Sequence, residues 1–191
     1  ATSTFNTVNP TLAANRCAAL QAHGLISGAN TAELAASAMA ALDAAGWQPE
    51  SRDLQASMYA FATPSIAMTY SNSLGRFSVK DNLCGLSFSG GVAALPASFG
   101  TGNGVPPTAG IAIFNNNSVG GAVADAASFS LVNGVAVQNY NIDGALCQRE
   151  LAIGSSANAR LVQQGIAEAS RSGNLRGKPA LIVHGRADTL I

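Results

Sequence analysis

Length, composition and charge narrow the classes to which this sequence can belong. The chain has 191 residues, enough for one domain or for a small domain and part of another. Charged residues make up 10% of it, the formal net charge is zero and no basic cluster occurs, so nucleic acid is not expected as a partner. No apolar run approaches the roughly 20 residues that span a bilayer, so no membrane partner is expected either. The N-terminal segment ATSTFNTVNP lacks the features of a signal peptide, and any such signal is expected to have been removed.

The first part of the chain, through residue 75, is predicted to be a small helical bundle. Asn9 can cap a helix that Pro10 opens. Asn30 and Glu33 have the spacing of a capping box at the start of a second helix. The spacing of apolar residues, together with these caps and breaks, predicts helices over residues 10–24, 30–46, 53–62 and 63–70.

Residues 75–140 have a different composition, rich in Gly, Pro and Asn. The stretches FGTGNGVPPTAG and FNNNSVGGA carry turn and loop chemistry. The apolar residues 111–114 between them are too few to assign. A long irregular segment of this kind is typical of a functional loop or a cap over an active site.

Regular structure is expected again in the last part of the chain. A helix is predicted over Asp143–Leu151, and Ser155 or Ser156 can cap another that ends near Gly173. Residues 180–183 form a continuous apolar run, which is typical of a strand buried on both faces of a parallel sheet. Because one strand cannot form a sheet, its neighbours would have to come from other polypeptide.

The stretch after that expected strand carries the chemistry. Asp188 follows Val183 by five residues, after a Gly turn, where a carboxylate can accept a hydrogen bond from a catalytic imidazole. The pattern strand-HG-x-x-D resembles the acid loop of α/β-hydrolases, and the alternative is an Asp that caps a turn. We interpret His184 as a packed residue at the strand end and not as the catalytic base.

A nucleophile is harder to find. The elbow pattern G-x-S-x-G fails at one glycine around Ser87 and at another around Ser89, and neither serine precedes a convincing helix. His23 is interpreted as a residue at a helix end. The sequence contains no Walker-type loop, paired-Cys zinc pattern or HExxH motif, so no cofactor and no metal are expected.

The three cysteines Cys17, Cys84 and Cys147 leave two interpretations open. They can be small buried apolar residues. They can also form one disulfide with a thiol left over, which would fit an extracellular or periplasmic protein.

Three segments together resemble bacterial 3-hydroxybutyrate oligomer hydrolases: SLGRFSVKDNLCGLSF, NYNIDGALCQRELA and GNLRGKPALIVHGRADTLI. The resemblance implies a serine esterase that cleaves short oligomers released from the storage polyester polyhydroxybutyrate. It implies a fragment of an α/β-hydrolase, with a helical and loop cap over residues 1–140 and a partial core, one helix and one parallel strand, over residues 141–191. It places the nucleophile upstream of Ala1 and the catalytic His downstream of Ile191, with Asp188 as the triad acid. The expected partners are a small oligoester and the remaining segments of the parent hydrolase.

Two other interpretations compete with this one. The chain can be a non-catalytic helical module whose C-terminal strand pairs with a partner. It can also be part of an esterase for another substrate class, of the aryl or tannin type.

Overall fold

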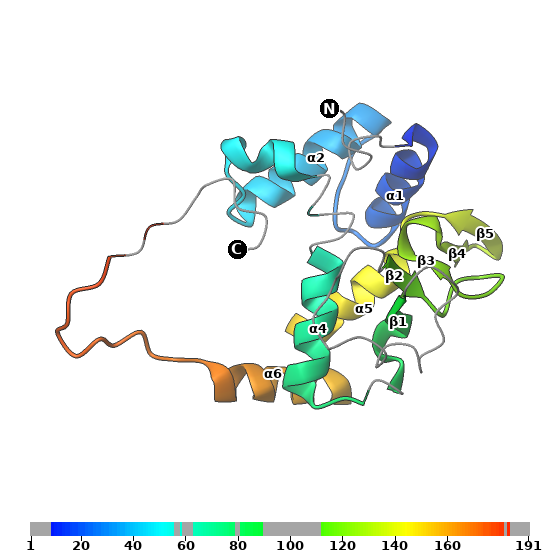
Figure 1. The fold of residues 1–191 in the computed structure, drawn as a ribbon. Helices are drawn as coiled ribbons and strands as arrows, with labels where there is room; N and C mark the ends of the chain where they lie inside the picture. The colour runs from blue at the N-terminus through cyan, green and yellow to red at the C-terminus, as the bar shows by residue number, and fades with distance from the viewer. Residues whose placement is uncertain are drawn as a thin grey trace.

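The computed structural model describes residues 9–55, 58, 63–78, 81–89, 112–181 and 183. The helices are α1 (Pro10–Ala22), α2 (Thr31–Ala44), α4 (Thr63–Gly75), α5 (Ile142–Ile153) and α6 (Ala157–Ala169), with 3-10 turns η2 (Pro49–Leu54), η5 (Leu83–Gly85) and η7 (Asp125–Ala127). The strands are β1 (Leu86–Ser89), β2 (Ala112–Asn115), β3 (Val123–Ala124), β4 (Phe129–Val132) and β5 (Val135–Gln138). Figure 1 shows α4, α5 and α6 below α1 and α2, with the strands on one side.

Side-chain caps begin the helices where the sequence predicts them. Asn9 Oδ1 accepts from the amides of Thr11 and Leu12 at the start of α1. Asn30 Oδ1 accepts from the Glu33 amide at the start of α2, while the Glu33 carboxylate accepts from the Ala29 amide. The predicted helices over residues 10–24, 30–46 and 63–70 are therefore confirmed, the last extending to Gly75. Most of the predicted 53–62 segment lies outside the described residues.

The two C-terminal helices are also confirmed, with one shifted end. Ser156 Oγ caps α6 by accepting from the Ala159 amide. The helix ends at Ala169 with Ser170 as its C-cap, before the predicted stop at Gly173. Apolar burial reaches only as far as Val162 and Gly165, so the last turn has no core contact that would extend it.

The described strands are all antiparallel, which corrects the predicted fold class. One sheet has the order β1-β2-β3, and β4 and β5 form a separate hairpin. The segment predicted as irregular, residues 75–140, thus contains these strands. The expected parallel core strand is wrong: the described residues 180, 181 and 183 have no regular structure, and Leu181 and Val183 are 88% and 87% exposed. An apolar run becomes a buried strand only when neighbouring strands pair with it, and no described strand lies beside this one. The chain is therefore not an α/β-hydrolase fragment.

The core lies where α4, α5, α6 and β1–β2 meet. One cluster contains Met68, Leu86 and Ile113, and a second contains Leu83, Leu151 and Val162. Cys84 packs against both clusters. Because the disulfide from Cys84 reaches Cys147 on α5, a covalent bond ties the strand side of the core to the helical side.

The contact between α4 and α6 depends on a glycine, Gly165. A Cβ at Gly165 of α6 would lie 2.0 Å from the Leu74 carbonyl oxygen of α4. Only a residue without a side chain lets the two backbones approach this closely. The proposed boundary at residue 140 stays a prediction, although α4 and η5, before it, pack with α5 and α6, after it.

Candidate functional site

The predicted acid Asp188 and its neighbour His184 lie outside the described residues, so their roles stay predictions. The chain that leads to them is described. After α6 it runs without regular structure through residues 170–181, and Figure 1 shows this segment leaving the helical body. Within it, hydrogen bonds join near neighbours, such as Asn174 N to Ser172 Oγ and Lys178 N to Leu175 O. Leu175, Leu181 and Val183 are 50%, 88% and 87% exposed.

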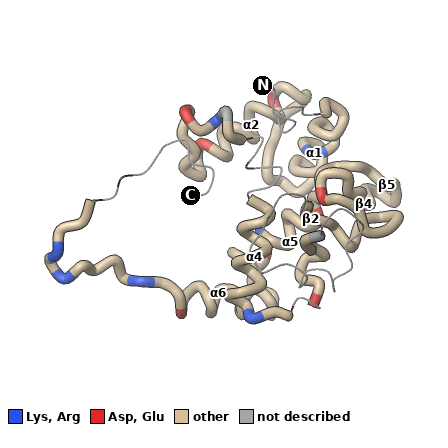
Figure 2. The backbone as a smooth tube through the Cα atoms, in the orientation of Figure 1, with Lys and Arg blue, Asp and Glu red and all other residues tan. Residues whose placement is uncertain are grey.

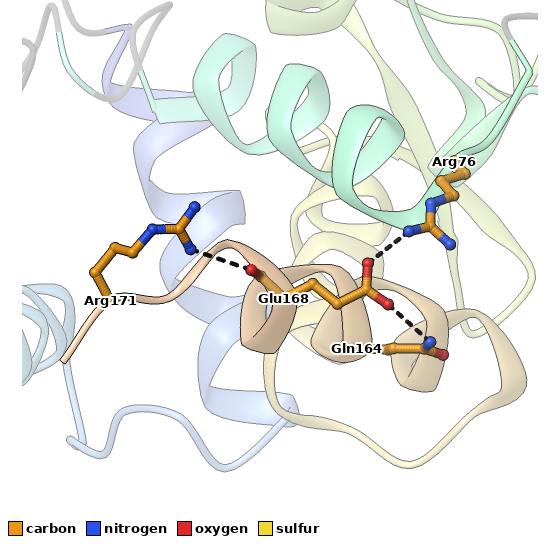
Figure 3. Close-up of polar contacts among 4 residues, drawn as sticks. All are labelled: Arg76, Gln164, Glu168 and Arg171. Atoms are coloured by element: carbon orange, nitrogen blue, oxygen red, sulfur yellow. Dashed lines mark hydrogen bonds and ion pairs between the residues drawn. The ribbon is translucent and has the colours of Figure 1, made fainter.

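A polar network on the surface fixes where this segment leaves the body. Glu168 on α6 pairs with Arg76 at the end of α4 and accepts from Gln164 Nε2, as Figure 3 shows. Arg171 Nη1 donates to the Glu168 backbone carbonyl, which turns the chain at its exit from the helix. These side chains are exposed, so the ion pair adds little stability. The network has no nucleophile, and we interpret it as structural.

The two candidate serines do not form a triad in the described part of the chain. Ser87 on β1 is 1% exposed, and its hydroxyl bonds the side-chain amide of Asn116. Nothing is described of the Ser89 side chain. Of the two histidines only His23 is described, and it is the exposed C-cap residue of α1, as the sequence predicted. Within the described residues Ser87 is therefore a buried hydroxyl that bonds an amide and not an imidazole.

Asparagine side chains connect η5, β2 and α5 in a hydrogen-bonded network. Asn116 Nδ2 donates to Asn82 Oδ1 at 2.9 Å, and Asn82 Nδ2 donates to Asn117 Oδ1 at 3.2 Å. On the other side of β2, Asn115 Nδ2 donates to Asn141 Oδ1 at 2.9 Å. Asn115 and Asn141 are buried, and buried amides are stable only when they are paired, whereas Asn82 and Asn116 are half-buried and Asn117 is exposed. They fix the loop after β2 against the start of α5.

The carboxyl of Asp125 is the charged group at the edge of this network. Asn141 Nδ2 donates to Asp125 Oδ1. Burial raises the pKa of Asp125 from 3.8 to about 6, against the opposing effects of the Asn141 hydrogen bond and the Arg16 charge. A carboxyl with such a pKa can exchange a proton near neutral pH. Its described contacts hold the turn at the start of α5, so we assign it a positioning role.

The turn at Tyr140 and Asn141, directly before α5, is strained and is held by several contacts. Tyr140 and Asn141 are consecutive non-glycine residues with positive φ, 55° and 52°. Arg16 Nη1 on α1 donates to the carbonyls of Asn139 and Tyr140. Asn141 also caps α5 by accepting from the Gly144 amide at 2.9 Å. Contacts from α1, β2 and η7 thus hold a backbone conformation that costs free energy.

The cysteines resolve the alternatives that the sequence left open. Cys84 and Cys147 form a disulfide with a Cα–Cα distance of 5.5 Å, and Cys17 is free. The interpretation as one disulfide with a thiol left over is confirmed, and the interpretation of all three as buried apolar residues is wrong. Within the described residues no group of three or more His, Cys, Asp or Glu side chains could hold a metal ion. No described helix is long and apolar enough to cross a membrane.

Sequence reasoning missed two features whose signals are visible in the printed sequence. Asp125 is the only charged residue between Asp81 and Asp143, which marks it as a group with a particular role. Asn133-Gly134 between two apolar runs is a strong signal for a tight hairpin, and it joins β4 to β5. No comparable local signal predicts the pairing of the asparagines, because their partners lie far apart in the sequence.

The described residues form a mainly helical domain with two small antiparallel sheets. A disulfide and a network of hydrogen-bonded asparagine side chains hold its elements together. The chain belongs to the 3HB-oligomer hydrolase family, whose model matches residues 1–191.

Named relatives agree with this assignment. A D-(-)-3-hydroxybutyrate oligomer hydrolase of Albidiferax ferrireducens is 62% identical over 205 residues, covering 100% of this chain and 29% of the relative. One from Polaromonas naphthalenivorans is 61% identical over 206 residues, with 100% and 29% coverage. One from Ralstonia pickettii is 48% identical over 193 residues, with 93% and 25% coverage. The chain therefore spans less than a third of the length of these relatives. No solved structure matches it.

Proposed function

We propose that this chain is part of a longer serine esterase that hydrolyses the ester bonds of short 3-hydroxybutyrate oligomers. The observation that carries the proposal is the family match over residues 1–191, together with relatives named D-(-)-3-hydroxybutyrate oligomer hydrolase at up to 62% identity. A substrate of this kind is a small oligoester whose ester units are uncharged and whose one end is a carboxylate.

The proposed mechanism is nucleophilic catalysis through a Ser-His-Asp triad. A serine attacks the ester carbonyl while a histidine takes its proton, the ester C–O bond breaks, and the leaving hydroxyl group takes that proton from the histidine. Water, activated by the same histidine, then hydrolyses the acyl-enzyme and releases the acid and the free serine. Asp188 accepts a hydrogen bond from the imidazole, orients it and stabilises its charged form. The nucleophile and the histidine are supplied by parts of the longer hydrolase outside this chain. Support for Asp188 comes from its place in the HG-x-x-D pattern.

The structure gives the described part a supporting role in this proposal. Ser87 is buried against an amide, which fits a nucleophile located elsewhere. The exposed segment over residues 170–181 leads from a tied helical body towards Asp188. Such a segment can carry a catalytic acid into a site that other polypeptide completes.

Two assays test the proposal. The full-length hydrolase should cleave a 3-hydroxybutyrate trimer with a much higher kcat/KM than a short aryl ester, and a serine-directed phosphonate should abolish that activity. The purified 191-residue chain alone should not cleave the trimer. Phosphonate-sensitive turnover by the chain alone would contradict the external nucleophile, and a preference for the aryl ester would support the other substrate class.

We also propose an extracellular or periplasmic location. The Cys84–Cys147 disulfide supports it, because disulfides persist in oxidising compartments. Alkylation of the protein from its native fraction without a reductant should modify Cys17 alone. Modification of all three cysteines in that fraction would place the protein in a reducing compartment.

A further inference from the structure

The β4–β5 hairpin buries a group of polar side chains at its base. Phe129 pairs with Gln138, so the residues one step further from the turn, Ser128 and Asn139, face each other, and Asn139 N donates to Ser128 O at 3.4 Å. Alternate side chains along a strand share a face, which places Ser128, Ser130 and Asn139 on the same side. Ser128 and Asn139 are 0% exposed, and Ser130 is 2% exposed. This side of the hairpin base is therefore shut off from bulk solvent.

Two buried polar atoms on this face, Ser128 Oγ and Asn139 Nδ2, have no hydrogen-bond partner within the described residues. The other end of the Asn139 amide is satisfied, because Asn139 Oδ1 accepts from Ser130 Oγ at 3.2 Å and from the Ile142 amide at 3.4 Å. Since a backbone amide can only donate, the Ile142 contact also fixes which end of the Asn139 side chain is the donor. A buried polar group without a partner lowers stability, so such groups are normally paired with protein or with ordered water.

The chemistry around these two atoms suits a small uncharged ligand. Asn139 Nδ2 offers only hydrogens, so the ligand must accept a hydrogen bond, and a metal cation cannot do so. Figure 2 shows β4 and β5 without a charged residue along their length. A buried anion would need a charged donor, and Arg16, the cation beside this end of β5, already donates from Nη1 to the carbonyls of Asn139 and Tyr140.

We propose that one internal water molecule binds between Ser128 and Asn139. Opposed residues of antiparallel strands have Cβ atoms about 4.5–5.5 Å apart, so both side chains can reach one molecule between them. The water accepts from Asn139 Nδ2 and donates to Ser128 Oγ, two of the two to four bonds that a buried water makes. Ser128 N donates to the Asp125 carbonyl at 3.1 Å, and Asn139 Oδ1 accepts from the Ile142 amide. The water therefore completes a polar connection between η7, the hairpin base and the start of α5.

The test is a high-resolution crystal structure of the full-length hydrolase and of two variants. In the wild type we expect the density of one water within hydrogen-bond distance of both Ser128 Oγ and Asn139 Nδ2. Ser128→Ala removes one of the two side-chain partners, so this density should be lost. Ser130→Ala is the matched control, because Ser130 is as buried and lies on the same face, but its hydroxyl bonds Asn139 Oδ1. The density should remain in that variant. If a variant does not fold, the wild-type structure alone decides.

Four results would overturn the proposal. One is a direct hydrogen bond between Ser128 Oγ and Asn139 Nδ2, with no molecule between them. The second is a protein group from the rest of the hydrolase in this position. The third is density whose height and contacts require an ion. The fourth is equal density in Ser128→Ala and in the wild type, which would show that the Ser128 hydroxyl does not bind the water.

Discussion

The tied helical body and the segment that follows α6 differ in how they are stabilised. In the body, Met68, Leu151 and Val162 are 0%, 2% and 3% exposed, and a disulfide joins η5 to α5. In the segment, Leu181 is 88% exposed, and hydrogen bonds such as that from Arg176 N to Asn174 Oδ1 join near neighbours in the sequence. The body therefore holds the stability of the described structure. The segment leads to Asp188 and should contribute to activity without contributing to that stability.

Loss of the disulfide should have the largest effect on the body. The bond closes a loop with a sequence separation of 63 residues. The double variant Cys84→Ala/Cys147→Ala should lower the free energy of unfolding by about 4 kcal/mol. Chemical denaturation of the oxidised wild type and the variant measures this, with Cys17→Ala as a control that should change little. Equal midpoints would show that core packing alone holds η5 and α5 together.

A methyl group at the helix crossing should have the next largest effect. Gly165→Ala places a Cβ 2.0 Å from the Leu74 carbonyl oxygen, so α4 and α6 must move apart. We expect a loss of about 2 kcal/mol, since overpacking outweighs the better helix propensity of Ala. The exposed neighbour Gln164→Ala should stay within about 0.5 kcal/mol of the wild type. A stabilised Gly165→Ala protein in thermal denaturation would contradict the close crossing.

The buried carboxyl of Asp125 should make the stability of the body depend on pH. Its folded pKa of about 6 lies above the unfolded value of 3.8, so the native state binds the proton more tightly. This contribution is complete below about pH 3.8 and is lost as the pH rises through about 6. Asp125→Asn should remove this dependence, a difference of at most about 3 kcal/mol between the two ends of that range. Parallel pH profiles of unfolding for both proteins would contradict the assignment.

The smallest effect on stability is expected in the segment. Leu181→Ser removes an apolar side chain that is 88% exposed, so the free energy of unfolding of the 191-residue chain should change by less than about 0.5 kcal/mol. Differential scanning calorimetry of the variant beside the wild type measures this. A loss comparable to that of Gly165→Ala would mean that the segment packs on the body, and the distinction between the two regions would fail.

The helices of the body could be predicted from the sequence because their signals are local. Asn9, Asn30 and Ser156 cap helices through bonds to residues two or three positions away, as the sequence indicates. The strand expected over residues 180–183 was wrong, because its signal is not of this local kind. An apolar run indicates that a segment is expected to be buried. Burial depends on the elements that pack against the segment, and a local sequence pattern does not identify them.

The candidate site was predictable only in part, for the same reason. The pattern around Asp188 predicts a catalytic acid, and this stays a prediction, because the residue lies outside the described part of the chain. The asparagine network joins Asn115 to Asn141 and Asn82 to Asn116 across long sequence distances. Of the residues around it, the sequence could have marked Asp125, because it is a lone charge in a long uncharged stretch.

The central claim, that this chain supplies the catalytic acid of an oligomer hydrolase, is tested most directly by Asp188→Asn in the full-length hydrolase. Turnover of the 3-hydroxybutyrate trimer, normalised to folded protein by circular dichroism, should fall at least about a hundred-fold, because the uncharged amide cannot stabilise the imidazolium and favours the wrong tautomer of the histidine. The unfolding midpoint should stay unchanged, and His184→Asn should change turnover per folded molecule less than about ten-fold. Near-wild-type turnover in Asp188→Asn, or a larger loss in His184→Asn, would contradict the account.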